Sequence, residues 1–210
     1  MTRELVEAGY HCTVTWVAER ELERAQADLG DTVTFVQADL LDPNSAAQVV
    51  EAVPDLEAVV NLVGGFAMTG LVHETDPREF DRLLRLNVAP AFNLARAAMP
   101  RLVERGGGAF VAVSARAAVR PFGGAAAYIT GKAAVLAFVQ ALDADYRQHG
   151  IRANAILPSV IDTPANRAGQ PDADHSKWVQ PAEIARVVRF LVSGDSSVTS
   201  GAAIPVYGRA

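Results

Sequence analysis

AAYITGK, residues 126–132, lies between two strand-like stretches, AFVAVS at 109–114 and IRANAILP at 151–158. Valine, isoleucine and other apolar residues dominate the flanking stretches and favour strands, whereas the alanine-rich stretch between them favours a helix. A strand, a helix and a second strand in this order predict two parallel strands joined by a helix that covers the sheet.

The same alternation extends in both directions along the chain. The expected helices are residues 2–9, 19–29, 43–53, 77–105, 124–148 and 181–192, and the expected strands are residues 11–16, 32–37, 56–63, 109–114, 152–157 and 202–206. Gly30 and Gly106 are placed to end helices, and Asp42 is placed to cap one. We therefore expect an α/β fold with a doubly wound, Rossmann-like parallel sheet, in a single domain of residues 1–210.

Composition excludes several classes of function. The chain has 210 residues, half of them hydrophobic, and a net charge of −5, so no basic surface for nucleic acid is expected. Its single cysteine rules out an intrachain disulfide, and its four scattered histidines do not predict a metal site. No apolar run has transmembrane length. We expect a cytoplasmic protein that acts on a small molecule.

Tyr128 and Lys132 are four residues apart in the expected helix, so the two side chains share one helix face. A cation beside a phenol favours the phenolate and lowers its pKa. Such a pair can exchange a proton with a carbonyl or an alcohol near neutral pH. Taken alone, the pattern also fits a surface tyrosine and a solvated lysine.

The chain resembles the short-chain dehydrogenase/reductases in an ordered series of motifs. These are Asp39-Leu40 after a strand, Asn61-Leu62-Val63-Gly64 after a buried strand, Asn87 in a helix, Tyr128-x-x-x-Lys132, and the stretch from Pro158 to Thr163. The resemblance spans essentially the whole chain. It implies an enzyme that transfers hydride between NADP or NAD and a carbonyl or alcohol.

The resemblance also implies roles for particular residues. Tyr128 is expected to be the general acid, with Lys132 lowering its pKa and bonding the nicotinamide ribose, and Asn87 kinking its helix and holding a water. The expected cofactor contacts are Asp39 and Leu40 at the adenine, Asn61 and Gly64 at a close backbone approach, and Ile161 and Thr163 at the nicotinamide amide. Each position also fits an ordinary cap, turn or buried polar residue.

Two positions depart from the family pattern. The family usually places a substrate-orienting hydroxyl thirteen residues before the tyrosine, where this chain has Ala115, with Ser114 one residue earlier. We keep Ser114 as a catalytic candidate, although adjacent strand residues point to opposite faces of a sheet.

The second departure is the absence of the first strand and the Gly-rich turn against which the pyrophosphate sits. We expect about 25 further residues upstream of Met1, enough for a strand, a turn and part of a helix. The alternative is a lineage that has lost dinucleotide binding and serves as a partner subunit or ligand-binding scaffold. The choice between NADP and NAD stays open, because neither Glu19 nor Arg20 is convincingly placed to select one.

Three further expectations follow. Residues 114–119 and 157–167 resemble dihydropteridine reductase and its bacterial relatives, which suggests a quinonoid pterin-like substrate as one option. Residues 165–179 are expected to form a short substrate loop, with Asn166, Arg167, His175 and Trp178 either lining it or forming a polar surface loop. The helices at 77–105 and 124–148 are expected to pair in a homodimer or homotetramer.

Overall fold

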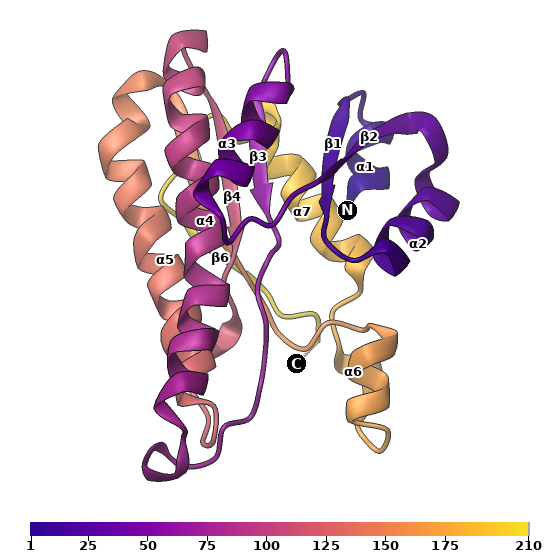
Figure 1. Cartoon of the computed structure of the whole chain (residues 1–210), viewed down its shortest axis with the longest axis vertical. Coiled ribbons are helices and arrows are strands. Elements are labelled where there is room, and N and C mark those ends of the chain that lie inside the picture. The colour runs from indigo at the N-terminus through magenta and orange to yellow at the C-terminus, as the bar shows by residue number, and fades with distance from the viewer. Residues whose placement is uncertain (210) are drawn as a thin grey trace.

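The computed structural model describes residues 1–209, in which parallel strands alternate with helices (Figure 1). The strands are β1 (Cys12–Trp16), β2 (Val33–Gln37), β3 (Ala58–Asn61), β4 (Gly108–Val113), β5 (Ile151–Pro158) and β6 (Ala203–Val206). Each expected strand is present, with ends that differ from expectation by a few residues. All strand pairs are parallel, so the Rossmann-like α/β fold is confirmed.

The strands form two separately bonded sheets. One holds β1 and β2, and the other has the order β3-β4-β5-β6, so that β1 and β2 stand apart from β3 in Figure 1. In the doubly wound order, the first strand of the fold lies in the middle of the sheet. Among residues 1–209, no strand joins β1 to β3 at this middle position. The upstream segment expected there stays a prediction.

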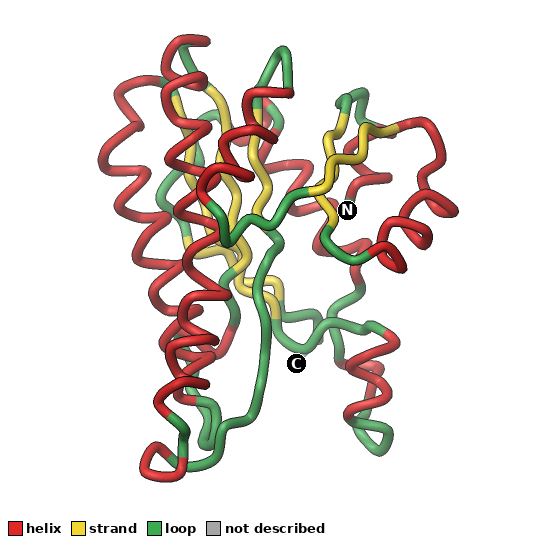
Figure 2. The backbone as a smooth tube through the Cα atoms, in the orientation of Figure 1, coloured by secondary structure: helices red, strands yellow, loops and turns green. Residues whose placement is uncertain are grey.

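The helices, apart from α6, also match the sequence expectations, and Figure 2 shows their regular alternation with the strands. They are α1 (Thr2–Glu7), α2 (Glu19–Leu29), α3 (Pro43–Ala52), α4 (Pro77–Arg105), α5 (Ala126–Tyr146), α6 (Pro164–Gly169) and α7 (Pro181–Val192). Asp42 caps α3 by accepting hydrogen bonds from the backbone N–H groups of Asn44 and Ser45. Gly106 ends α4 at a φ of 84°, a left-handed conformation that glycine adopts without strain.

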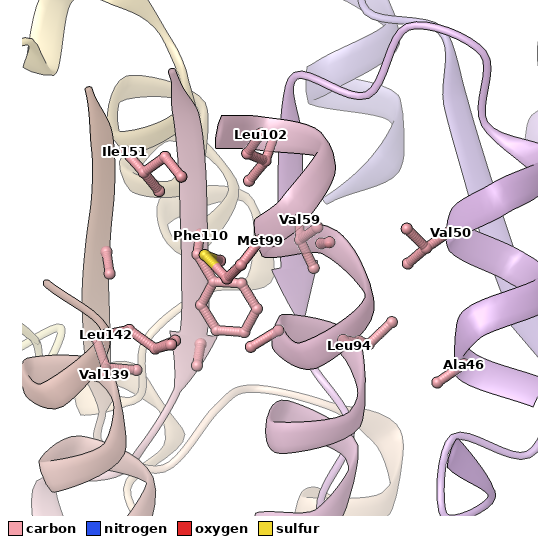
Figure 3. Packing of buried hydrophobic residues seen from close by; sticks show 14 of the residues in the cluster. Ala46, Val50, Val59, Leu94, Met99, Leu102, Phe110, Val139, Leu142 and Ile151 are labelled. Atoms are coloured by element: carbon pink, nitrogen blue, oxygen red, sulfur yellow. The ribbon is translucent and has the colours of Figure 1, made fainter. Parts of the chain in front are cut away.

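Alternate residues of β4 face two different hydrophobic layers. Phe110 lies in the layer that α3, α4 and α5 contribute, where Figure 3 shows it beside Met99. Val111 faces the other layer, which contains Leu5 of α1 and Val188 of α7. Helices therefore cover both faces of the four-stranded sheet. In folds of this kind, ligands bind at the carboxyl ends of the strands.

The helix α6 differs from the sequence expectation, which was a loop over residues 165–179. Thr163 caps α6 by accepting a hydrogen bond from the backbone N–H of Asn166, and Pro164 occupies the first helical position. Proline fits there because the first turn does not use its missing N–H. Because of this cap and this proline, residues 164–169 form a short helix at the start of the expected loop.

Candidate active site

Tyr128 and Lys132 lie in the first turns of α5, just after the segment that leaves β4. Lys132 is buried, with 5% of its surface exposed, and Tyr128 is partly buried. Gly131 between them lets α5 approach α4 closely, because a Cβ there would lie 3.1 Å from the Cβ of Asn87. The local sequence therefore places the lysine at a tight helix–helix contact.

The Lys132 ammonium is held at the end of β4. Its Nζ donates a hydrogen bond to the main-chain oxygen of Val113 at 3.0 Å. Burial lowers the pKa of Lys132 to about 8, because the charged form loses contact with water. An ammonium carries three protons, and within residues 1–209 only this one hydrogen bond engages it. Two donors are thus left for other acceptors.

The Tyr128 phenol behaves differently from the sequence expectation. Burial raises its pKa above the ordinary value, so within the protein alone desolvation outweighs any effect of the Lys132 charge. The expected lowering of the phenol pKa is therefore wrong for this structure. The Tyr128 ring also meets the edge of Phe66, with ring centroids 5.0 Å apart and planes at 89°.

Asn87 links α4 to the turn that follows β3. It is fully buried, and its Nδ2 donates to the carbonyl oxygens of Leu83 at 2.9 Å and Gly65 at 3.0 Å. Its Oδ1 accepts from the backbone N–H of Gly65 at 3.1 Å. α4 is assigned as one continuous helix from Pro77 to Arg105. The expected kink and bound water stay predictions.

Gly64 brings this cluster together. A Cβ on Gly64 would lie 2.6 Å from Asn87 Oδ1 and 2.7 Å from Lys132 Nζ, closer than real Cβ atoms approach such atoms. Asn61, three residues before Gly64 in the same motif, is buried, and its Oδ1 accepts from the backbone N–H of Val63 at 3.2 Å. The structure therefore groups Asn61, Gly64, Asn87 and Lys132 around the carboxyl ends of β3 and β4.

Ser114 points into the protein. Its hydroxyl donates to the main-chain oxygen of Lys132 at 2.7 Å, and the side chain is 2% exposed. Ala115, which occupies the family's usual hydroxyl position, is also buried. The expectation that strand alternation turns Ser114 away from the reacting side agrees with this bond.

Ile161 and Thr163 follow β5, where the chain turns into α6. The Ile161 carbonyl accepts from Asn166 Nδ2 at 2.8 Å and from the backbone N–H of Thr163 at 2.9 Å. The Thr163 hydroxyl caps α6. These residues lie at the same edge of the sheet as the end of β4, since neighbouring parallel strands end together.

The comparisons with known proteins agree with this geometry. A family model described as enoyl-(acyl carrier protein) reductase matches residues 1–208. A solved structure described as a short chain dehydrogenase/reductase family protein is 31% identical and covers 98% of this chain and 88% of its own, with a TM-score of 0.90. The chain belongs to the short-chain dehydrogenase/reductase family.

Two further relatives are similar over most of their length. The 2-(R)-hydroxypropyl-CoM dehydrogenase of Xanthobacter autotrophicus strain ATCC BAA-1158 / Py2 is 30% identical over 194 residues, which are 85% of this chain and 78% of the relative. A gluconate 5-dehydrogenase from Burkholderia cenocepacia J2315, solved with NADP and tartrate, is 25% identical, covers 98% of this chain and 87% of its own, and has a TM-score of 0.87. Membership of the short-chain dehydrogenase/reductases confirms the expected enzyme class, an NAD(P)-dependent oxidoreductase.

Asp39 and Leu40, the expected adenine contacts, follow β2 in the smaller sheet. The exposed Asp39 carboxylate accepts from the backbone N–H of Leu41 at 2.9 Å. The Leu40 side chain is 5% exposed and belongs to the hydrophobic core, while its carbonyl accepts from Asn93 Nδ2. The structure thus places both residues just after the end of β2, and their role toward a cofactor stays a prediction.

The polar residues of the expected substrate loop already have partners within the chain. Arg167 pairs with Asp162, with Nε 2.5 Å from Oδ1, and this pairing lowers the pKa of Asp162 to about 2. His175 lies 2.9 Å from the Gln170 carbonyl oxygen and packs against Trp178, which is buried. These contacts hold the segment after β5 in place.

Sequence reasoning missed Phe66 and its neighbours after Gly64-Gly65. The signal was present as an uncharged run from Leu62 to Val72, directly after β3.

Within residues 1–209, no cluster of three or more histidine, cysteine, aspartate or glutamate residues could hold a metal ion. No helix in that range is both long and apolar enough to span a membrane.

Proposed function

We propose that this short-chain dehydrogenase/reductase transfers hydride between NADP or NAD and a small carbonyl or alcohol, with Tyr128 and Lys132 moving the proton. One observation carries the proposal: the buried Lys132 ammonium lies one helical turn from the Tyr128 phenol and keeps two protons for further acceptors. A solvated surface lysine, the alternative that the bare pattern left open, does not match this burial.

The proposed roles of the chain's own groups follow from their protonation. The raised pKa of Tyr128 keeps its phenol protonated at neutral pH, so it can donate a proton to a carbonyl oxygen. A bound nicotinamide supplies the hydride that adds to the carbonyl carbon. Lys132 stabilises the phenolate left by this proton transfer, and a ribose hydroxyl is a suitable acceptor for its remaining protons. In the oxidation direction, the phenolate takes the proton from the alcohol.

The residues present fit the nicotinamide half of the cofactor. Two unengaged protons on a buried ammonium match a ribose hydroxyl. Gly64 places no Cβ beside Lys132 Nζ, which suits a close approach of the ring. Ile161 and Thr163 are proposed to meet the nicotinamide amide, and Asp39 with Leu40 the adenine. The NADP bound to the gluconate 5-dehydrogenase supports NADP as one option, with NAD as the other.

The substrate is proposed to be a small carbonyl or alcohol, with a quinonoid pterin-like compound as the option that the dihydropteridine reductase-like stretches suggest. Two relatives are named for a 2-hydroxypropyl compound and for gluconate, and both compounds carry a secondary alcohol. The Tyr128 proton donor suits this shared group.

The test replaces the proton donor alone. Tyr128→Phe removes the hydroxyl and keeps the ring against Phe66, so folding and cofactor binding are expected to survive. Carbonyl reduction with NADPH or NADH is expected to fall by at least about 100-fold in kcat, the usual contribution of a general acid. Activity that the variant retains in full contradicts the role of Tyr128.

The sequence left one alternative open, a family member that performs no redox chemistry and serves as a partner subunit or ligand-binding scaffold. Titration of the 210-residue chain with NADPH and NADH separates this alternative from hydride transfer, since micromolar binding contradicts the alternative. An in-frame Gly-rich segment upstream of Met1 in the genomic reading frame supports hydride transfer.

We also propose a cytoplasmic homodimer or homotetramer that pairs through α4 and α5. Phe92 of α4 is 50% exposed and packs against Phe138 of α5, with ring centroids 6.0 Å apart. A partly exposed aromatic pair on two long helices is a suitable centre for a subunit contact. Sedimentation that shows only monomer contradicts this proposal.

A further inference from the structure

Large apolar side chains gather in two exposed segments beside Tyr128. Eleven large hydrophobic residues in the described chain are exposed, and seven of them lie in the segments after β3 and β4: Leu62, directly after β3, and six others further along. We call these six the apolar rim: Phe66 (58% exposed), Met68 (59%), Leu71 (57%), Val72 (76%), Val119 (47%) and Phe122 (48%). Scattered exposed apolar residues need no explanation, but a concentration of this kind marks a binding surface.

Contacts join the two segments to each other and to the catalytic tyrosine. The backbone N–H of Thr69 donates to the Gly124 carbonyl at 2.8 Å, and a Cβ on Gly124 would lie 2.8 Å from Met68 Cε. Phe66 meets the Tyr128 ring edge to face at 5.0 Å. In Figure 1 the segment after β3 runs along α4 to the start of that helix. The apolar rim therefore continues directly from the proton donor.

Charge is scarce around the apolar rim. Residues 62–72 contain no aspartate, glutamate, lysine, arginine or histidine, and residues 117–130 contain only Arg120. Glu74 borders the end of the rim at Leu71, where its carboxylate already accepts a hydrogen bond from the Leu71 backbone N–H at 2.9 Å. Across the site, the polar groups of the segment after β5 are already engaged, with Arg167 on Asp162 and Asn166 on the Ile161 carbonyl. This arrangement favours an uncharged partner, because a charged one would lose water and gain few polar contacts.

We propose that the apolar rim binds the uncharged, apolar part of the carbonyl substrate and that Phe66 is the main specificity-determining contact. The inference rests on the proposed hydride transfer, since it assigns the non-reacting part of the same substrate. An alkyl or aryl tail that covers Phe66 and Met68 removes apolar surface from water in the bound state. The tail also covers the open side of Tyr128.

The first experiment measures kcat/KM for methyl ketones whose tail grows from methyl to hexyl, with the enzyme and its nicotinamide cofactor. Each added methylene is expected to raise kcat/KM roughly fourfold, the value that corresponds to about 0.8 kcal/mol for a buried CH₂. Keto acids of matched length, with a carboxylate at the tail end, are expected to show no such gain. The proposal is overturned if kcat/KM does not change with tail length, or if the keto acids show an equal gain in kcat/KM.

The second experiment uses Phe66→Ala and Leu71→Ser, with Phe190→Ala as the control. Phe190 is 43% exposed on α7 and lies outside the apolar rim. The readout is the ratio of kcat/KM for the hexyl ketone to that for the methyl ketone, which does not depend on how much of the variant is folded. Phe66→Ala is expected to reduce this ratio about tenfold or more through KM, Leu71→Ser severalfold, and Phe190→Ala not at all. An unchanged ratio in Phe66→Ala overturns the proposal.

These outcomes are distinct from a failure of the proposed function. If no carbonyl of any length is reduced with NADPH or NADH, hydride transfer itself is wrong. If all lengths are reduced with equal efficiency, hydride transfer stands and the apolar rim has another occupant, for which a second copy of this chain is the alternative. Sedimentation of Phe66→Ala then shows whether the rim holds subunits together.

Discussion

The Ser114 hydroxyl donates a hydrogen bond to the main-chain oxygen of Lys132, and the Lys132 ammonium donates one back to the main-chain oxygen of Val113. The two bonds run in opposite directions between the end of β4 and the second turn of α5. Together they fix the positions of the Lys132 backbone and of its ammonium group relative to the sheet. We infer that Ser114 acts through Lys132 as a positioning residue.

Ser114→Ala is expected to lower the free energy of unfolding by about 1 kcal/mol, the usual net value of one hydrogen bond. The KM for the nicotinamide cofactor is expected to rise more than kcat falls, because Lys132 loses part of its support. Urea unfolding and steady-state kinetics measure the two effects. A fall in kcat of about 100-fold with unchanged stability would instead indicate that Ser114 contacts the substrate.

Gly64→Ala is expected to abolish most activity, because the new methyl group must displace Asn87 Oδ1, Lys132 Nζ or both. Overpacking of this kind typically costs about 1–3 kcal/mol of stability, and misplaced catalytic groups cost roughly 100-fold in rate. Gly123→Ala is the matched control, since a Cβ at Gly123 meets no atom within 4 Å. Equal losses in both variants, measured by thermal unfolding and ketone reduction, would contradict the tight contact at Gly64.

Much of the fold could be predicted because the local signals agree with the tertiary arrangement. Glycines after helices, such as Gly30 and Gly106, marked the element ends. The largely apolar stretch 56–63, which ends at Gly64-Gly65, identified the buried strand β3. The helix α6 could not be read in the same way, since six residues are too few to show a helical period.

The candidate site was predictable only where a motif places a residue. Motif order alone does not say how far apart Asn61, Asn87 and Lys132 lie in space. The fold brings these three residues together at one edge of the sheet. The pKa of Tyr128 was predicted in the wrong direction because the pattern shows a neighbouring charge and hides the burial. Phe66 was missed since contacts between two loops depend on the tertiary structure alone.

Lys132 is expected to make stability depend on pH in alkaline solution. Its pKa is about 8 in the folded chain and ordinary, near 10.5, in the unfolded chain, so between these values the unfolded state binds more protons. Stability from this group therefore rises as the pH increases from about 8 to about 10.5. The cost of the buried charge below pH 8 is on the order of 3 kcal/mol.

Lys132→Met tests this expectation, because methionine fills a similar volume without charge. The variant is expected to be more stable than the parent at pH 7, with a difference that shrinks as the pH rises toward 10. Tyr10 and Cys12, whose pKa values burial raises, also titrate in this range, but they are common to both proteins and cancel in the difference. A stability difference that does not change with pH contradicts the low pKa.

Arg152 is expected to be a major source of stability far from the site. Its guanidinium donates to the carbonyl oxygens of Leu191 at 2.6 Å and Ser193 at 3.0 Å and to the Ser196 hydroxyl, and no carboxylate within residues 1–209 pairs with it. These carbonyls close α7, where the helix leaves its last acceptors unpaired and carries partial negative charge. Burial lowers the pKa of Arg152, because the charged form loses contact with water.

Arg152→Met removes several hydrogen bonds from a charged donor to part-buried carbonyl oxygens, so a loss of roughly 3 kcal/mol in the free energy of unfolding is expected. Arg105→Met is the control, because Arg105 forms a half-exposed ion pair with Glu57, a type of contact worth at most about 1 kcal/mol. Urea unfolding measures both variants, and activity below the unfolding transition is expected to match the parent in each. If Arg105→Met costs as much as Arg152→Met, the main-chain contacts at the end of α7 do not supply the stability assigned to them.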